Sequence, residues 1–308
     1  MRFNRLDMNL LAALDILLKT RSVTQAAEEM FITQSAMSNA LGRLRTYFDD
    51  PLLVQVGRGM ELSPLAETLQ APVREIMLRV ESATRIRPQF DPATDEREFS
   101  VVLSDYTLAL IGAALSRRVA EEAPGITLNL RPQHAQPAQL LDRGEADLLI
   151  VPDFLGAPDQ ESCPVFEDSL VVLVAQDGPH AAQDMTLARF AAAPQVLMEP
   201  TTGQESFSAV AMRGAGIVPR KVLSLFLFSA IPDLIRGTDR VALIQRRLAE
   251  KAVPQGGLLI RPAPFEAPPL RQSIRWQAHR GNDPGLRWLR DLILDCAARD
   301  AGADAPRA

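Results

Sequence analysis

Residues 31–48 carry two different stripes on a single helical period. Apolar side chains recur at every third or fourth position, the spacing of a helix that packs on a core. The opposite stripe consists of small hydrogen-bonding residues instead of the lysine and glutamate that suit a solvated helix face. The apolar stripe contains Met37, Ala40, Leu41, Leu44 and Phe48, and the polar stripe contains Ser35, Ser38, Asn39, Gly42 and Thr46. The pattern predicts a helix over residues 34–47 whose polar face is suited to close contact.

Two further helices are predicted before this one. Leucines fall on one side of a helix over residues 6–20. Ser22 and Gln25 stand three residues apart, which is the spacing of a capping box and predicts the start of a second helix. Thr33 is the expected N-cap of the third helix. The order is that of a helix-turn-helix.

A short hairpin is predicted after the third helix. Residues 51–62 contain two apolar runs around Gly57-Arg58-Gly59, where the glycines permit the positive φ of a tight turn. Three helices followed by a hairpin predict a winged helix-turn-helix over residues 1–62.

This architecture gives the polar face a function. A recognition helix must bring short side chains close to base edges, where Ser, Asn and Gln donate and accept hydrogen bonds. Arginines beside the helix and in the wing suit phosphate or minor-groove contacts. The alternative is a helical hairpin that packs on another helix, with small residues for close approach. The expected DNA-binding residues are Ser22, Thr33, Gln34, Ser35, Ser38, Asn39, Arg43 and Arg58.

Residues 63–90 are predicted to form a long linker helix. Ser63 is the expected N-cap, Pro64 suits the first helical position, and Pro72 is expected either to kink the helix or to reduce its stability. Apolar residues then step by four, three, four and three, as in a coiled-coil seam. A seam without a partner in its own chain predicts a homodimer, and the alternative is packing on the C-terminal domain. The seam residues are Leu69, Val73, Ile76, Val80 and Ala83.

Residues 91–303 alternate short apolar runs with helical stretches. This order predicts an α/β domain whose parallel sheets carry helices on both faces. The chain is expected to cross between two lobes near residues 164–168 and 262–270, as in a hinged clamshell. The expected lobes are lobe I, residues 97–165 and 270–300, and lobe II, residues 166–265.

Ligands of open α/β sheets bind beyond the carboxyl ends of the strands. Several of the residues at these ends have other interpretations: Ser104 and Thr202 as helix caps, Phe228 as core, and Arg247 as a solvated helix start. The expected effector-binding residues are Ser104, Asp105, Val151, Thr201, Thr202, Phe228 and Arg247.

The composition limits the cellular compartments and the classes of partner that are possible for this chain. A hydrophobic content of 47% with 23% charged residues is typical of a soluble globular chain. The net charge of −5 excludes a general polycation, but not a local nucleic-acid site, since residues 1–62 are neutral overall. Asp7 and Asp15 interrupt the first apolar run, so we expect neither a signal peptide nor a membrane span. Two cysteines form no disulfide framework, and a cytoplasmic protein is expected.

The stretch "SVTQAAEEMFITQSAMSNALGRLRTYFDDPLLVQVGRGMELSPLAETL" resembles the N-terminal signature of LysR-type transcriptional regulators. Ser35 departs from the proline that this family most often has there. The resemblance implies a C-terminal effector domain similar to periplasmic solute-binding proteins. It also implies an inverted-repeat operator in double-stranded DNA, a homotetramer built from dimers, and contact with RNA polymerase. No cofactor is expected.

Two further stretches, "FDPATDEREF" and "WQAHRGNDPGLRWLRDLI", resemble the branch of this family that contains nodulation-gene and salicylate- or nitroarene-responsive regulators. The inducers of that branch are flavonoids, salicylate and other small aromatics, often for catabolic operons. Arg247 would suit a carboxylate or phenolate, and Phe228 an aromatic contact. The expected mechanism is that an effector between the lobes favours one hinge geometry and so changes the spacing of the DNA-binding heads.

Other functions have weaker support in the sequence. His134, His180 and His279 are isolated, so no zinc site is expected. The sequence contains no G-x-S-x-G elbow and no Walker loop, which leaves an enzyme on the α/β lobes as a weak alternative. Redox sensing through Cys163 and Cys296 is the second alternative. Activation and repression are both compatible with the sequence.

Overall fold

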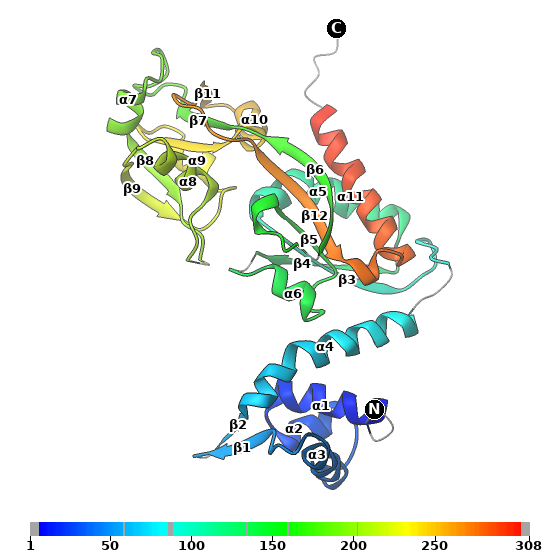
Figure 1. The fold of residues 1–308 in the computed structure, drawn as a ribbon. Coiled ribbons are helices and arrows are strands. Elements are labelled where there is room, and N and C mark those ends of the chain that lie inside the picture. Colours follow the sequence, from blue (N-terminus) through cyan, green and yellow to red (C-terminus); the bar gives the residue numbers. More distant parts are fainter. Residues whose placement is uncertain are drawn as a thin grey trace. The chain divides into compact units, whose positions relative to one another are not determined.

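A computed structural model describes residues 6–57, 59–85, 89–133, 135–158, 160–201 and 203–302 (Figure 1). The chain divides into two units, one of residues 1–86 with 142–145, and one of residues 87–141 with 146–308. Thr202 and Arg58 lie outside the described residues.

The N-terminal unit begins with three helices, and a side-chain oxygen caps the N-terminus of each one. Ser22 Oγ accepts a hydrogen bond from the Gln25 amide, and Thr33 Oγ1 accepts one from the Ala36 amide. Asp7 caps the first helix. The apolar stripe of the third helix, including Met37 and Leu44, is buried on the first two. The helices are α1 (Met8–Thr20), α2 (Val23–Glu29) and α3 (Gln34–Phe48).

The predicted wing is a two-stranded antiparallel sheet of β1 (Leu53–Val56) and β2 (Gly59–Leu62). The guanidinium of Arg45 donates to the carbonyls of Pro51 and Leu53, at 2.8 and 2.9 Å. Arg45 therefore ties the recognition helix to the base of the wing.

The linker helix α4 (Pro64–Arg85) begins after Ser63 and contains Pro72, as expected. Its predicted seam is divided between two environments. Val73 is buried in the core that α1 contributes to, whereas Ile76 is exposed. Part of the seam therefore packs on its own DNA-binding domain, an arrangement that was not expected from the sequence. The side chain of Ala83 lies outside the described residues.

The first sheet of the larger unit has the strand order β4-β3-β5-β12-β6. The strands β4, β3 and β5 are parallel, whereas β12 runs antiparallel to both of its neighbours. Helices α5 and α11 share one buried cluster on this sheet, and α6 belongs to another. The elements are β3 (Arg97–Leu103), α5 (Asp105–Glu122), β4 (Ile126–Pro132), α6 (Ala138–Asp142), β5 (Leu148–Pro152), η2 (Asp153–Leu155), β6 (Gln160–Asp168), β12 (Leu270–Gln277), η4 (Ala278–Arg280) and α11 (Pro284–Gly302).

The second sheet has the order β11-β7-β10-β8-β9. Helices α7 and α8 contribute to one buried cluster, and α9 and α10 contribute to the cluster that contains α5 and α11. The elements are β7 (Leu170–Ala175), α7 (Leu187–Ala192), β8 (Pro194–Met198), α8 (Phe207–Gly214), β9 (Arg220–Leu225), α9 (Ile231–Ile235), β10 (Val241–Gln245), α10 (Arg246–Ala252), η3 (Val253–Gln255) and β11 (Leu258–Pro262).

The elements β6, β11 and α10 were not predicted, and the expectation of purely parallel sheets was wrong. Both sheets are mixed instead, because the strands on either side of the crossings pair in antiparallel fashion. The strand β6 escapes prediction because Pro164 and three acidic residues interrupt its apolar alternation. The crossings themselves lie at Ser169, between β6 and β7, and in residues 263–269, between β11 and β12.

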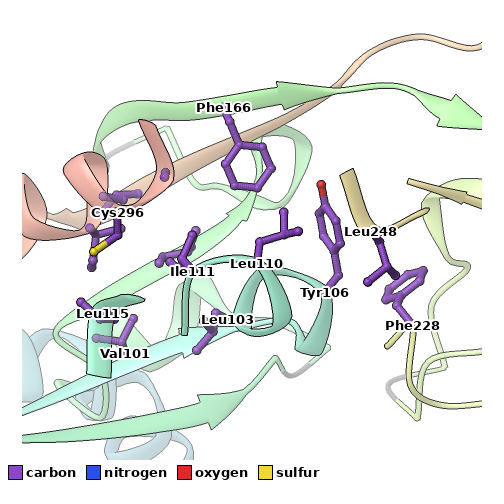
Figure 2. Close-up of a cluster of buried hydrophobic side chains, with 14 of the residues drawn as sticks. Val101, Leu103, Tyr106, Leu110, Ile111, Leu115, Phe166, Phe228, Leu248 and Cys296 are labelled. Carbon is purple, nitrogen blue, oxygen red and sulfur yellow. The ribbon is translucent and has the colours of Figure 1, made fainter. Parts of the chain in front are cut away.

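One buried cluster continues through both lobes (Figure 2). Tyr106 of α5 lies between Phe166 on β6 and Phe228 of the second lobe, with edge-to-face ring distances of 6.1 and 6.3 Å. Leu248 of α10 joins the same cluster. Lobe movement therefore has to repack an aromatic cluster, which restricts the lobes to discrete arrangements.

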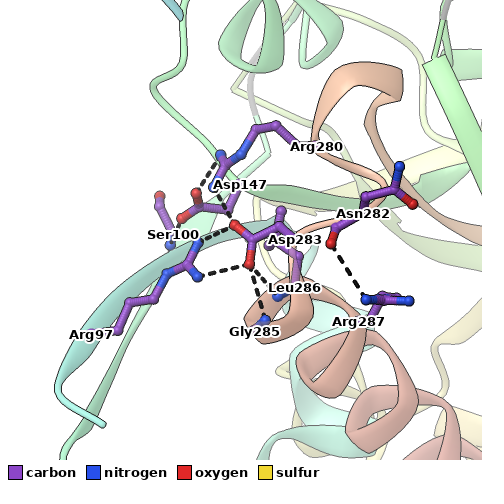
Figure 3. A network of polar contacts seen from close by, with 9 residues as sticks. All are labelled: Arg97, Ser100, Asp147, Arg280, Asn282, Asp283, Gly285, Leu286 and Arg287. Carbon is purple, nitrogen blue, oxygen red and sulfur yellow. Dashed lines mark hydrogen bonds and ion pairs between the residues drawn. The ribbon is translucent and has the colours of Figure 1, made fainter. Parts of the chain in front are cut away.

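An ion-pair network joins residues 280–283, directly before α11, to the first sheet (Figure 3). Arg97 on β3 binds both carboxylate oxygens of Asp283, at 2.8 and 2.6 Å, while Arg280 pairs with Asp147 at 2.6 Å. Burial alone would raise the pKa of Asp283, but the hydrogen bonds from Arg97 and from the Leu286 amide hold it below its ordinary value.

Candidate functional site

The polar face of α3 is open to solvent. Gln34, Ser35, Ser38 and Asn39 are exposed, and a Cβ at Gly42 would meet nothing within 4 Å. The structure therefore brings the predicted residues of this helix together on one uncovered surface. Short side chains allow such a surface to approach the base edges of a major groove closely.

Ser22, Thr33 and Arg43, the other predicted DNA-binding residues within the described ranges, have additional structural roles. Ser22 and Thr33 use their hydroxyl oxygens to cap helices, and Thr33 Oγ1 also lies 3.0 Å from Ser35 Oγ. Arg43 pairs with Asp7 through a 3.2 Å contact between Nη2 and Oδ2, and both side chains are exposed. The backbone hydrogen bond from Leu10, together with Arg43, holds the pKa of Asp7 below its ordinary value. A phosphate would compete with Asp7 for Arg43.

In each lobe, the carboxyl end of a strand lies beside a strand that begins just after the chain has crossed from the other lobe. Residue pairing places Gln272, the third residue of β12, beside Pro152 at the end of β5. It also places Gln245 at the end of β10 beside Leu170 at the start of β7. The crossing residue Ser169 directly precedes Leu170. In open α/β sheets, ligands generally bind in such a region, beyond the carboxyl ends of the strands.

Asp168 connects three elements in this region. Its carboxylate accepts a 2.5 Å hydrogen bond from the Tyr106 hydroxyl and further bonds from the amides of Ser169 and Arg247. The side chain is buried. Tyr106 and Asp168 were not predicted as functional residues, because nothing in the local pattern shows that residues 62 positions apart meet.

Ser104 and Asp105 are already engaged within the chain. Ser104 Oγ caps α5 by accepting from the Thr107 amide. The Asp105 carboxylate accepts a 2.8 Å hydrogen bond from the Ser229 amide of the second lobe. Asp105 therefore links the two lobes in this conformation.

Among the predicted effector-binding residues, Arg247 has the polar group that is most available to a ligand. Its guanidinium lies over the Phe166 ring, 4.7 Å from the centroid, and the residue is half-buried. It forms no ion pair with any residue in the described ranges. A partly desolvated guanidinium without a carboxylate is a suitable group for binding an anion.

The other predicted effector residues have different environments. Val151 is buried in the cluster that α6 covers, and Phe228 is 7% exposed against Tyr106. In this conformation both side chains pack in the core, which for Phe228 was the alternative interpretation. Thr201 is exposed in a turn.

Two buried glutamines add polar groups that sequence reasoning missed. Gln245 and Gln272 are each 2% exposed, and within the described part of the chain their Oε1 atoms have no hydrogen-bond partner. An unsatisfied buried carbonyl oxygen destabilises the fold unless water or a ligand donates to it. For Gln245 the available signal was a glutamine at the end of the otherwise apolar strand β10, whereas Gln272 lies among polar residues of β12 and carried no such signal.

Two further contacts join the lobes. The rings of Phe154 and Phe207 stack with centroids 6.4 Å apart, and Gln204 Nε2 donates to the Ala135 carbonyl at 2.6 Å. Phe154 is exposed although its ring is stacked.

The cysteines differ in environment. Cys296 is buried, and this burial raises the pKa of its thiol. Cys163 is half-buried on β6. A raised pKa disfavours the reactive thiolate, so Cys296 lacks the environment of a redox-sensing cysteine. The described residues contain no cluster of three His, Cys, Asp or Glu side chains placed for a metal ion. No helix within those residues has the length and apolar content needed to span a bilayer.

A winged helix-turn-helix joined by a long helix to a two-lobed α/β domain is an architecture typical of DNA-binding transcriptional regulators with an effector domain. The chain matches the bacterial regulatory helix-turn-helix protein, lysR family, over residues 8–67, and the LysR substrate binding domain over residues 92–298. It therefore belongs to the LysR family of regulators, which are not enzymes. Members of the family bind DNA and small-molecule effectors and are oligomeric.

Full-length relatives agree with this assignment. The chain is 33% identical to nodulation protein D 2 of Rhizobium leguminosarum bv. phaseoli, covering all of this chain and 97% of the relative. It is 34% identical to nodulation protein D 3 of Rhizobium meliloti, with the same coverage of both chains.

Solved structures share the fold. A probable transcriptional regulator from Pseudomonas aeruginosa superposes with a TM-score of 0.63 at 28% identity, covering 94% of this chain and 97% of that one. A full-length variant of OxyR from Pseudomonas aeruginosa gives a TM-score of 0.69 at 16% identity, with coverages of 95% and 97%.

Proposed function

We propose that this regulator binds a small aromatic effector with an anionic group between its two lobes and thereby controls an operon for aromatic catabolism. The observation that carries this proposal is the half-buried Arg247 guanidinium, which has no ion pair among the described residues. A carboxylate or phenolate would form charge-assisted hydrogen bonds with it. The similarity to nodulation protein D supports an aromatic inducer of the flavonoid type.

Further groups around the crossing strands support the same ligand class. The unpartnered Oε1 atoms of Gln245 and Gln272, counted within the described residues, would accept hydrogen bonds from effector hydroxyls or from bridging water. Ser104, Asp105, Thr201 and Thr202 are the other proposed contacts at the strand ends. Val151 and Phe228 would support the site from the core, as their burial indicates.

The effector is proposed to act through the packing between the lobes. The Tyr106 cluster and the Asp105–Ser229 bond favour the present arrangement, so a ligand must bind another arrangement better in order to shift the equilibrium. In a cytoplasmic assembly of dimers, such a shift would change the spacing of the DNA-binding heads, DNA bending and contact with RNA polymerase.

The proposed DNA interface is the exposed face of α3 with its flanking arginines. Gln34, Ser35, Ser38 and Asn39 would read bases, while Arg43 and Arg58 would bind phosphate or the minor groove. Ser22 and Thr33 would contact the backbone of the duplex. A homodimer through the exposed part of α4, including Ile76, would place two such faces on an inverted repeat.

The effector proposal is tested by thermal shift of the full chain with salicylate, benzoate, catechol and naringenin. A ligand that binds only the folded state raises the melting temperature, by an amount that grows with its concentration. We expect an anionic aromatic to do so for the wild type and for Arg246→Gln, a matched control, since Arg246 already pairs with Glu250 and Ser169. Arg247→Gln should abolish the shift. A shift that survives Arg247→Gln would overturn the assigned role of Arg247.

A second measurement tests the function itself. Footprinting and transcription assays with the same compounds should change when an effective ligand is present. An unchanged footprint and unchanged transcription across the panel would contradict effector control by aromatics.

A further inference from the structure

Phe31 occupies an unusual position at the end of α2. It follows the C-cap residue Met30, has a φ of +54° and is 97% exposed. Its amide donates to the Glu28 carbonyl, and the next amide, of Ile32, donates to the Ala27 carbonyl. The backbone therefore serves as a C-terminal helix cap.

Folding alone gives no reason for phenylalanine at this position. Left-handed backbone at a helix end favours glycine or asparagine, because a Cβ followed by a bulky side chain is strained there. Full exposure also leaves the ring without the burial that would offset this strain. Asparagine would close the helix equally well and avoid both penalties.

The location of the ring indicates which interaction offsets the backbone strain and the exposure. Phe31 stands two residues before Thr33, the N-cap of α3, and the neighbouring Ile32 is also exposed. This apolar pair continues directly into the polar face formed by Gln34, Ser35 and Ser38. In a helix-turn-helix, the N-terminal end of the recognition helix enters the major groove, where thymine offers an apolar methyl group.

We propose that Phe31 is a DNA-contacting residue whose ring packs on a thymine methyl group at the edge of the major groove. The inference rests on the proposed α3 interface and adds an apolar contact to its hydrogen-bonding residues. The strain at Phe31 is then compensated only in the complex with DNA.

The experiment uses the full chain and a duplex that the wild type selects from a random library. Phe31→Asn removes the ring and suits the backbone, so we expect its melting temperature to rise while its affinity for the duplex falls. Phe31→Tyr keeps the ring and should retain nearly wild-type affinity. Replacing each thymine of the selected site in turn by uracil removes single methyl groups. One such replacement should weaken wild-type binding by about fourfold, and leave the binding of Phe31→Asn unchanged.

Three outcomes would overturn the inference. In the first, Phe31→Asn binds the duplex as tightly as the wild type. In the second, every uracil replacement affects both proteins equally. In the third, Phe31→Asn changes only the oligomeric state, as a protein-facing ring would. Leu187→Asn, a change at an exposed apolar residue of α7, controls for general surface effects and should leave affinity unchanged.

Two further variants, measured on the same duplex, distinguish a failure of this inference from a failure of the proposed interface. If Ser38→Ala and Arg43→Ala weaken binding while Phe31→Asn does not, the interface holds and only the role of Phe31 fails. If neither Ser38→Ala nor Arg43→Ala changes binding, the proposed interface itself is wrong.

Discussion

The hydroxyl of Tyr106 donates a 2.5 Å hydrogen bond to the carboxylate of Asp168, and this bond ties the first helix of one lobe to the strand that crosses into the other. Asp168 also accepts from the amide of Arg247, whose guanidinium belongs to the proposed ligand site. The pair therefore links the lobe interface to that site.

Tyr106→Phe removes this bond while keeping the ring in the core. We expect the larger unit to lose about 2 kcal/mol of stability, the typical contribution of a buried hydrogen bond to a charged group. Both tryptophans, Trp276 and Trp288, lie in this unit, so urea unfolding followed by their fluorescence measures it selectively. Tyr47→Phe, in the other unit, is the control and should leave this transition unchanged. An equally stable Tyr106→Phe would show that the bond contributes nothing.

The ion pair of Arg97 with Asp283 predicts acid sensitivity (Figure 3). The folded-state pKa of Asp283 is lowered from 3.8, so its stabilising contribution is fully present above that value and is lost as the pH falls through the folded pKa. Asp283→Asn should be less stable than the wild type at neutral pH, and the difference should shrink below about pH 4. Urea unfolding at a series of pH values measures the free energy of unfolding of the wild type and of the variant. A difference that stays constant down to about pH 2 would contradict the prediction.

The contact between Asp7 and Arg43 predicts a variant that binds DNA more tightly. Asp7→Asn keeps an N-cap side chain for α1 but removes the carboxylate that competes with phosphate for Arg43. Affinity for the selected duplex should rise at low salt and fall more steeply as salt increases. Arg43→Ala should weaken binding and flatten the salt dependence, and adding Asp7→Asn to it should restore little. An unchanged salt slope in Arg43→Ala would argue against a phosphate contact.

The cysteine environments predict unequal reactivity. In the folded protein, iodoacetamide should modify Cys163 faster than Cys296, because Cys296 is buried and its pKa is raised. In urea the two rates should converge, which mass spectrometry of the alkylated peptides would measure. If peroxide altered DNA binding and Cys163→Ser abolished that response, the redox alternative would regain support.

Much of the N-terminal unit could be predicted from sequence alone. Ser22, Thr33 and the period of residues 34–48 act over three or four positions, so local geometry is enough to specify the helices and their caps. In the larger unit, most strands were predicted as apolar runs. The strand β6 was missed because Pro164 and acidic residues break its alternation, and its pairing with β12 comes from residues far away in the chain.

The two candidate sites also differ in how much of each could be predicted from the sequence. The exposed face of α3 follows from helical period, because a side chain's direction on a helix depends only on its position. The sequence by itself thus determined the fold class, the family and the set of residues on the exposed face of α3. Only the tertiary structure decided that Val73 packs on α1, that Asp105 and Asp168 already have partners within the chain, and that Arg247 has no ion pair among the described residues. Such contacts join residues far apart in the chain, and their partners are set by packing between elements rather than by any local pattern.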